Sequence, residues 1–214
     1  MKLKVCGLQH IDNLRQVLEC KPDFIGIICY EKSQRYAGRM NAAELCADFP
    51  SGTNKVGVFV NASLEYIKRR IQEFELNVVQ LHGNEDHGFC HSIKELNVEI
   101  IKVFHVDNQF DFSIVNSYSG CSDYFLFDTK TEAYGGSGKQ FDWRLLHQLK
   151  FDRPVFLSGG ISLADIGQIM RELPGISGID INSRFETSPG IKDIQQIRKA
   201  KQLIEQYNET VYSR

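Results

Sequence analysis

Eight short apolar runs, rich in β-branched and aromatic residues, recur along the 214-residue chain with polar, often amphipathic stretches between them. Apolar runs of this length are typical of strands buried on both faces, and the stretches between them suit helical crossovers of a parallel sheet. The sequence therefore predicts an α/β protein built from βα units. The runs are LKVCG (3–7), FIGIICY (24–30), KVGVF (55–59), VVQL (78–81), IIKVFHV (100–106), YFLFD (124–128), VFLSG (155–159) and GIDI (178–181).

Helical periodicity marks six of the stretches between and after the runs. In the third of them, Ser63 is a candidate N-cap and Leu64, Ile67 and Ile71 follow at helical spacing. The crossover at 109–119 is poor in helix formers, so we expect it to be short or irregular. The expected helices cover residues 12–20, 42–49, 63–74, 86–96, 163–173 and 193–207.

Eight strands that each lead into a crossover most simply close into a (β/α)8 TIM barrel. A chain of 214 residues is near the lower limit for this fold and leaves little room for insertions. A doubly wound open sheet is the structural alternative. No low-complexity tract or Pro/Gly linker divides the chain, so the sequence predicts one catalytic domain over residues 1–214.

Composition and charge exclude several other classes of protein. The formal net charge is -2 and no basic block is present, which argues against a nucleic-acid partner. No apolar stretch approaches the roughly 18 residues of a membrane span, and the opening MKLKVCGLQH lacks a signal-peptide core, so we expect a cytoplasmic protein. Six cysteines without a CxxC pair argue against a disulfide scaffold and give no sign of a metal site.

Polar or reactive side chains close most of the apolar runs. In a TIM barrel the active site lies at the carboxyl ends of the strands, so these side chains are the candidates for chemistry. Cys6, His82, Asp128 and Asp180 stand at four such ends. Taken singly, a thiol is more often inert packing, and His82 or Asp180 could be a hydrogen-bonded structural residue. Asp128 is stronger evidence, because burial at the barrel mouth raises the pKa of a carboxyl toward useful acid chemistry.

Glycine and small polar residues follow the last two strands. Gly159 and Gly160 come after the seventh run, and Asn182 and Ser183 come after the eighth. This is the place where TIM barrels commonly bind phosphate, with backbone N–H groups and the start of a short helix. Glycine suits such a site because a Cβ atom would hold the backbone away from the anion. A plain tight turn is the alternative, but the position favours a barrel of the phosphate-binding type.

A second glycine cluster follows the sixth run, at Gly135, Gly136, Ser137 and Gly138. Its spacing does not match a nucleotide-binding P-loop, and it does not lead from a strand into a helix. We therefore expect a lid loop that closes over the substrate.

Arg35 lies in the loop after the second run, on the same side of the expected barrel. Its guanidinium fork would suit a substrate carboxylate at the mouth of the site. A solvated surface charge is the alternative.

In chain order, nine segments together resemble the phosphoribosylanthranilate isomerase family. They span residues 4–193 and are KVCGL, DFIGIICYEKSQRYAG, KVGVFVN, VVQLHGNE, YFLFDT, GGSGKQFDW, FLSGGI, GIDINSRFE and PGIKD. The resemblance implies a (β/α)8 barrel, no metal or organic cofactor, and a role in tryptophan biosynthesis. The implied reaction is the Amadori rearrangement of N-(5'-phosphoribosyl)anthranilate to 1-(2-carboxyphenylamino)-1-deoxyribulose 5-phosphate. The implied partner is this small-molecule substrate, bound by a monomer or homodimer.

The resemblance also implies roles for individual residues. Cys6 would be the general base, Asp128 the general acid, and Arg35 the ligand of the anthranilate carboxylate. Arg184 stands where the family commonly has glycine, so it either adds a cation to the phosphate site or points outward. The remaining implied contacts are to phosphate (Gly159, Gly160, Asn182 and Ser183) and to the substrate pocket (His82 and Asp180).

Two other functions stay open. The nearest rival is the histidine-pathway isomerase, which performs the same rearrangement on an aminoimidazole substrate but has a carboxylate where Cys6 stands. Cys6, together with Arg35, favours anthranilate. A barrel that binds sugar phosphates without catalysis is the other alternative, and the presence of both Cys6 and Asp128 argues against it.

Overall fold

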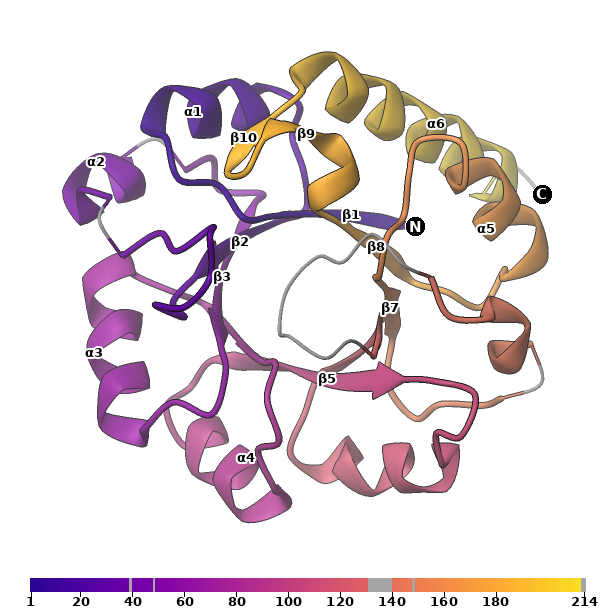
Figure 1. Cartoon of the computed structure of the whole chain (residues 1–214), viewed down its shortest axis with the longest axis horizontal. Helices are drawn as coiled ribbons and strands as arrows, with labels where there is room; N and C mark the ends of the chain where they lie inside the picture. Colours follow the sequence, from indigo (N-terminus) through magenta and orange to yellow (C-terminus); the bar gives the residue numbers. More distant parts are fainter. Residues whose placement is uncertain (39, 48, 131–139, 148, 213–214) are drawn as a thin grey trace.

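Eight parallel strands close into a barrel in the computed structural model, which describes residues 1–38, 40–47, 49–130, 140–147 and 149–212. Each strand pairs with the next one along the chain and β8 pairs with β1 (Figure 1). The predicted (β/α)8 barrel is confirmed, and the open doubly wound sheet is excluded. The strands are β1 (Lys2–Cys6), β2 (Phe24–Ile28), β3 (Asn54–Phe59), β4 (Val78–Leu81), β5 (Glu99–Val106), β6 (Tyr124–Thr129), β7 (Val155–Leu157) and β8 (Gly178–Ile181).

The crossovers form an outer layer around the ring of strands (Figure 1). The fifth crossover is a 3-10 helix, η1, which confirms the expected irregularity there, and the sixth is a shorter one, η2. A 3-10 turn, η3, and a small hairpin of β9 and β10 follow β8 and were not expected from the sequence. These elements are α1 (Ile11–Glu19), α2 (Ala42–Ala47), α3 (Leu64–Phe74), α4 (His87–Lys94), η1 (Phe112–Gly120), η2 (Trp143–Leu146), α5 (Ile166–Glu172), η3 (Ser183–Phe185), β9 (Glu186–Ser188), β10 (Ile191–Lys192) and α6 (Ile194–Tyr212).

Local capping determines where two of the helices begin. The Ser63 side chain accepts a hydrogen bond from the backbone N–H of Tyr66 at 3.2 Å, as the sequence predicts for α3. Asp86 caps α4 in the same way through the N–H of Phe89 at 2.8 Å. Each cap satisfies a backbone donor that has no partner within the helix.

Alternate residues of each strand face two separate cores. The outward residues, such as Leu3 and Val5 of β1, pack against the helices. The inward residues form a smaller cluster inside the barrel, where the rings of Phe24 and Phe156 meet edge to face at 5.3 Å. This cluster fills the lower barrel, so the polar inward residues at the carboxyl ends of the strands lie above a closed floor. In the part of the chain that the structure describes, no helix has both the length and the apolar character needed to cross a membrane.

Candidate active site

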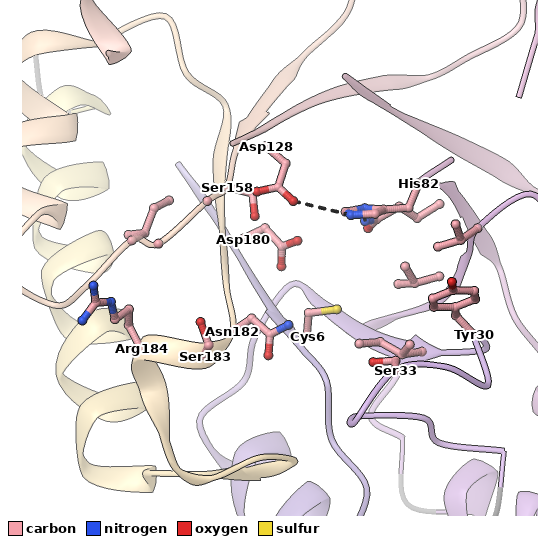
Figure 2. Close-up of a pocket in the computed structure, with 17 residues that line it drawn as sticks. Cys6, Tyr30, Ser33, His82, Asp128, Ser158, Asp180, Asn182, Ser183 and Arg184 are labelled. Atoms are coloured by element: carbon pink, nitrogen blue, oxygen red, sulfur yellow. Dashed lines mark hydrogen bonds and ion pairs between the residues drawn. The ribbon is translucent and has the colours of Figure 1, made fainter. Parts of the chain in front are cut away.

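A pocket opens at the carboxyl ends of the strands, where TIM barrels have their active sites. Cys6 from β1, His82 directly after β4, Asp128 from β6 and Asp180 from β8 all line it (Figure 2). The structure therefore brings together four candidate residues from distant parts of the sequence.

The Cys6 thiol is buried in the pocket wall, with 4% of the residue exposed. Gly26 is its register partner on β2, and a Cβ atom at that position would lie 2.4 Å from Cys6 Sγ. Glycine at position 26 thus makes room for the thiol. Burial raises the pKa of Cys6, and the ammonium group of Lys4 opposes that rise.

Asp128 and His82 face each other across the pocket. His82 Nε2 lies 3.4 Å from Asp128 Oδ2, and the backbone N–H of Thr129 donates to the other carboxylate oxygen at 2.8 Å. Burial, together with the nearby Asp180 carboxylate, raises the pKa of Asp128 to about 7. A carboxyl with this pKa is partly protonated at neutral pH and can donate a proton to a substrate.

The His82 imidazole is kept neutral by its surroundings. Burial and the neighbouring His105 ring hold the pKa of His82 well below its usual value. The two rings meet edge to face with centroids 5.0 Å apart, and Gln80 Nε2 lies 3.0 Å from His82 Nδ1. A neutral His82 adds no positive charge beside Asp128, and the Thr129 N–H and the Lys4 charge only partly oppose the rise of the Asp128 pKa.

The glycine pair after β7 has a backbone that other residues rarely adopt. Gly159 and Gly160 have φ angles of +89° and +66°, both in the left-handed region. A Cβ atom on Gly159 would lie 2.3 Å from Thr129 Oγ1, so the loop needs glycine there. Both glycines line the pocket, and Ser158 just before them does as well (Figure 2).

The loop after β8 completes this side of the pocket. Asn182, Ser183 and Arg184 all line it, and Ser183 and Arg184 belong to η3. The Arg184 side chain extends away from Cys6 in Figure 2, on the side of the pocket where Ser183 lies. The Arg184 cation is therefore at the edge of the expected phosphate site.

Arg35 is held by a carboxylate of the hairpin β9–β10. Its Nε and Nη2 atoms donate to Glu186 at 2.9 and 2.7 Å, and Lys192 Nζ donates to the same carboxylate at 2.6 Å. Only 12% of the Arg35 side chain is exposed, so it is not a solvated surface charge. Arg35 is not among the residues lining the pocket. Its side chain passes close to Gly7, next to Asn182, and its role toward a carboxylate stays a prediction.

The expected lid residues Gly135, Gly136, Ser137 and Gly138 lie outside the described residues. Gln140, directly after them, donates from Nε2 to the backbone oxygen of Gly160 at 3.1 Å. This end of the loop is thus attached to the expected phosphate site.

Among the described residues, one group offers ligand atoms that a metal ion could reach: His82, His105 and Asp128, whose ligand atoms lie within 4.8 Å of one another. The positive charges of Lys4 and Lys102 add to the lowering of the His82 pKa. The same charges would repel a metal cation. The expectation that no metal is needed stays a prediction.

Two side chains near the site were missed by the sequence reasoning. Lys4 is fully buried inside the barrel, and its Nζ lies 2.9 Å from Asp180 Oδ2. The sequence did contain an indication of this: Lys4 is a charged residue within an apolar run, two positions before Cys6 and therefore on the same face of the strand. Tyr30, the last residue of the second apolar run, lines the pocket, and its position at a strand end was the available signal.

The chain is similar in sequence to proteins of one family. Residues 3–203 match the family model described as N-(5'-phosphoribosyl)anthranilate (PRA) isomerase. The N-(5'-phosphoribosyl)anthranilate isomerase of Parabacteroides distasonis is 40% identical over 206 residues, which cover 95% of this chain and 93% of that protein.

Solved structures agree with the sequence matches. Phosphoribosyl anthranilate isomerase from Thermotoga maritima superposes with a TM-score of 0.85 at 31% identity, covering 96% of this chain and 99% of that one. A structure of the isomerase in complex with reduced 1-(o-carboxyphenylamino)-1-deoxyribulose 5-phosphate has a TM-score of 0.81 at 27% identity, covering 96% and 99%. The Thermotoga maritima enzyme is described as dimeric. The sequence match over residues 3–203 and the shared barrel show that this chain belongs to the N-(5'-phosphoribosyl)anthranilate isomerase family.

Proposed function

We propose that the protein isomerises N-(5'-phosphoribosyl)anthranilate in tryptophan biosynthesis, with Cys6 as general base and Asp128 as general acid. One observation supports these two roles most directly. A buried thiol and a carboxyl whose pKa is raised to about 7 line the same pocket, although they are far apart in the sequence. The reaction is an Amadori rearrangement, which needs one acid and one base.

The acid acts first. Opening the ribose ring requires a proton on the ring oxygen as the bond between C1' and that oxygen breaks. Asp128 supplies this proton, because its raised pKa keeps part of the carboxyl protonated near neutral pH. His82, 3.4 Å away, is neutral and so adds no positive charge that would favour the carboxylate before the transfer.

The base acts second. Ring opening leaves an iminium ion, which makes the proton on C2' acidic enough for a modest base. Cys6 removes that proton in its thiolate form, and the resulting enolamine tautomerises to the ketone product. Each proton transfer of this kind is worth roughly 10² to 10⁴ in rate.

Binding at the two ends of the substrate holds it between these groups. The phosphate binds at Gly159 and Gly160 and at the turn of Asn182 and Ser183, where the left-handed glycine backbone permits close approach. The anthranilate carboxylate binds Arg35. Positioning of this kind supplies a further large part of the rate enhancement.

Several broader expectations belong to the same proposal. Residues 1–214 act as one catalytic domain, as a monomer or homodimer in the cytoplasm. The reaction uses no cofactor or metal and involves no nucleic acid or membrane, and His82 and Asp180 contact the substrate.

A turnover assay with two substrates tests this function. Anthranilate derivatives fluoresce, so loss of N-(5'-phosphoribosyl)anthranilate can be followed continuously with the purified protein. The proposal expects turnover with this substrate and little or none with the aminoimidazole ribonucleotide of the histidine pathway. Turnover of the imidazole substrate alone would replace the proposal with its nearest rival, and binding without turnover would indicate a non-catalytic barrel.

A further inference from the structure

A buried ion pair lies next to the Cys6 thiol. Lys4 and Cys6 are two positions apart on β1, so their side chains share one face of the strand and both point into the barrel. Lys4 is in register with Asp180 on β8, and its Nζ lies 2.9 Å from Asp180 Oδ2. The exposed fractions of the two side chains are 0% and 6%, so the pair is shielded from bulk water. Charges in such a place act strongly on a neighbouring group.

The charge of this lysine acts on the thiol as well as on Asp180. Burial lowers the pKa of Lys4, but Asp180 and Cys6 raise it by more, so the net shift is upward and the side chain stays an ammonium. Burial raises the pKa of Cys6, and Lys4 opposes this rise more strongly than Asp180 adds to it. Without such an opposing charge, burial would leave the thiol with still less thiolate.

We infer that Lys4 is a positioning residue for the proposed base: its ammonium stabilises the thiolate of Cys6, and the Lys4–Asp180 pair holds that ammonium beneath the substrate pocket. The inference rests on the proposed role of Cys6 and adds to it the source of the thiolate. Asp180 has one oxygen on Lys4, and its other oxygen, Oδ1, is buried without a hydrogen-bond partner among the described residues.

The other charged groups around Cys6 act on the thiol less than Lys4 does. Lys192 from β10 also lowers the pKa of Cys6, but by less than Lys4, and its Nζ donates to Glu186 and to Asn182. On β2 the facing residue is Gly26, which carries no charge. On β6 Asp128 lines the same pocket, and its pKa of about 7 leaves it only partly charged. Lys4 is thus the cation best placed to stabilise the thiolate.

The test reads the ionisation of Cys6 without relying on turnover. Intact folded protein is alkylated with iodoacetamide at a series of pH values, and modification of Cys6 is resolved by peptide mass spectrometry. In Lys4→Met we expect the half-maximal pH for Cys6 alkylation to rise by at least about one unit, which is a tenfold lower rate near neutral pH. We also expect the rising limb of the kcat profile to move by the same amount, with KM changed less than about threefold.

Two further variants separate charge from structure. Lys4→Met/Asp180→Asn removes both charges and leaves no unpaired buried carboxylate, so it is the variant to use if Lys4→Met does not fold. The matched control is Lys102→Met/Glu85→Gln, which removes another buried lysine–carboxylate pair, 3.2 Å apart, and should leave Cys6 alkylation unchanged. Cys6→Ala tests the coupling from the other side: loss of the thiolate should lower the pKa of the Lys4 ammonium, measured by NMR of the lysine side chain.

The outcomes distinguish this inference from the proposed function. A folded Lys4 variant with the wild-type alkylation profile would overturn the role of Lys4, and so would an unchanged Lys4 titration in Cys6→Ala. If Lys4 shows no effect on Cys6 but Cys6→Ser is inactive, Cys6 remains the proposed base and only the role of Lys4 fails. If Cys6→Ser turns over normally, the base assignment itself fails.

Discussion

The Nε2 atom of His82 lies 3.4 Å from Oδ2 of Asp128, so a neutral imidazole faces the carboxyl group proposed to protonate the substrate. An imidazolium in this position would stabilise the carboxylate and make it a poor acid. The surroundings that keep His82 neutral therefore also keep Asp128 protonated at a useful pH, and the first prediction follows from this pair.

The rise of activity with pH should end near neutral pH. Asp128 must carry a proton to act as the acid and Cys6 must lose one to act as the base; the pKa of Asp128 is raised to about 7, and the pKa of Cys6 is raised above its ordinary value. Below about pH 7, kcat/KM should therefore rise about tenfold per pH unit, and above about pH 7 it should level off, because the gain of thiolate is offset by the loss of protonated Asp128. A profile of kcat/KM between pH 5 and 9 checks this. A kcat/KM that keeps rising about tenfold per pH unit up to pH 9 would rule out Asp128 as the acid in this protonation state.

Asp128→Asn should make the folded protein more stable at alkaline pH. Between about pH 4 and 7 the folded protein keeps a proton on Asp128 that the unfolded chain has lost, so the free energy of unfolding falls as the pH rises through this range. The amide of the variant does not titrate. The free energy of unfolding of Asp128→Asn should therefore exceed that of the wild type by about 2–4 kcal/mol at pH 8 and differ little from it at pH 4. Urea unfolding at both pH values measures it, with exposed Asp152→Asn as the control. A gain of equal size at both pH values would contradict the electrostatic explanation.

Gly159→Ala should damage both stability and phosphate binding. The residue has φ +89°, and the new Cβ atom would lie 2.3 Å from Thr129 Oγ1. We expect a loss of about 1–3 kcal/mol in the free energy of unfolding and a clear rise in KM. Gly175→Ala is the matched control, because no atom lies within 4 Å of its added Cβ. Similar behaviour of the two variants would show that Gly159 has no special place in the site.

Arg35→Lys should weaken substrate binding more than it slows the chemistry. Lysine cannot reproduce the two-point pairing in which Nε and Nη2 of Arg35 donate hydrogen bonds to the Glu186 carboxylate at 2.9 and 2.7 Å. We expect KM to rise by about tenfold or more and kcat to change less. Arg198→Lys, in the exposed pair of Arg198 with Glu19, serves as the control and should leave both constants unchanged. If Arg35→Lys leaves KM at its wild-type value, Arg35 does not bind the carboxylate.

The strands and the strand-end residues of the site were predictable because they are local features. Each apolar run coincides with a strand to within two residues, since burial on both faces requires a continuous apolar segment. The barrel then brings all carboxyl ends to one side, which is why Cys6 and Asp128 could be expected in one pocket. The irregular fifth crossover was also visible, as a lack of helix-forming residues.

Long-range pairs could not be predicted from single residues. The Lys4–Asp180 contact joins positions 176 residues apart and exists only because β8 closes against β1. The alternation of side chains along β1 puts Lys4 on the inner face of the barrel, but it does not identify the residue with which Lys4 pairs. In the same way, Arg35 is paired with Glu186 by a hairpin whose strands are too short to show a periodic pattern.

The turnover number of two single variants tests the central claim most directly. If Cys6 is the base and Asp128 the acid, then Cys6→Ser and Asp128→Asn should each lower kcat by at least about a hundredfold with N-(5'-phosphoribosyl)anthranilate as substrate, while the circular dichroism spectrum stays that of the wild type. A folded variant of either kind that keeps near-normal kcat would contradict the assignment of its residue.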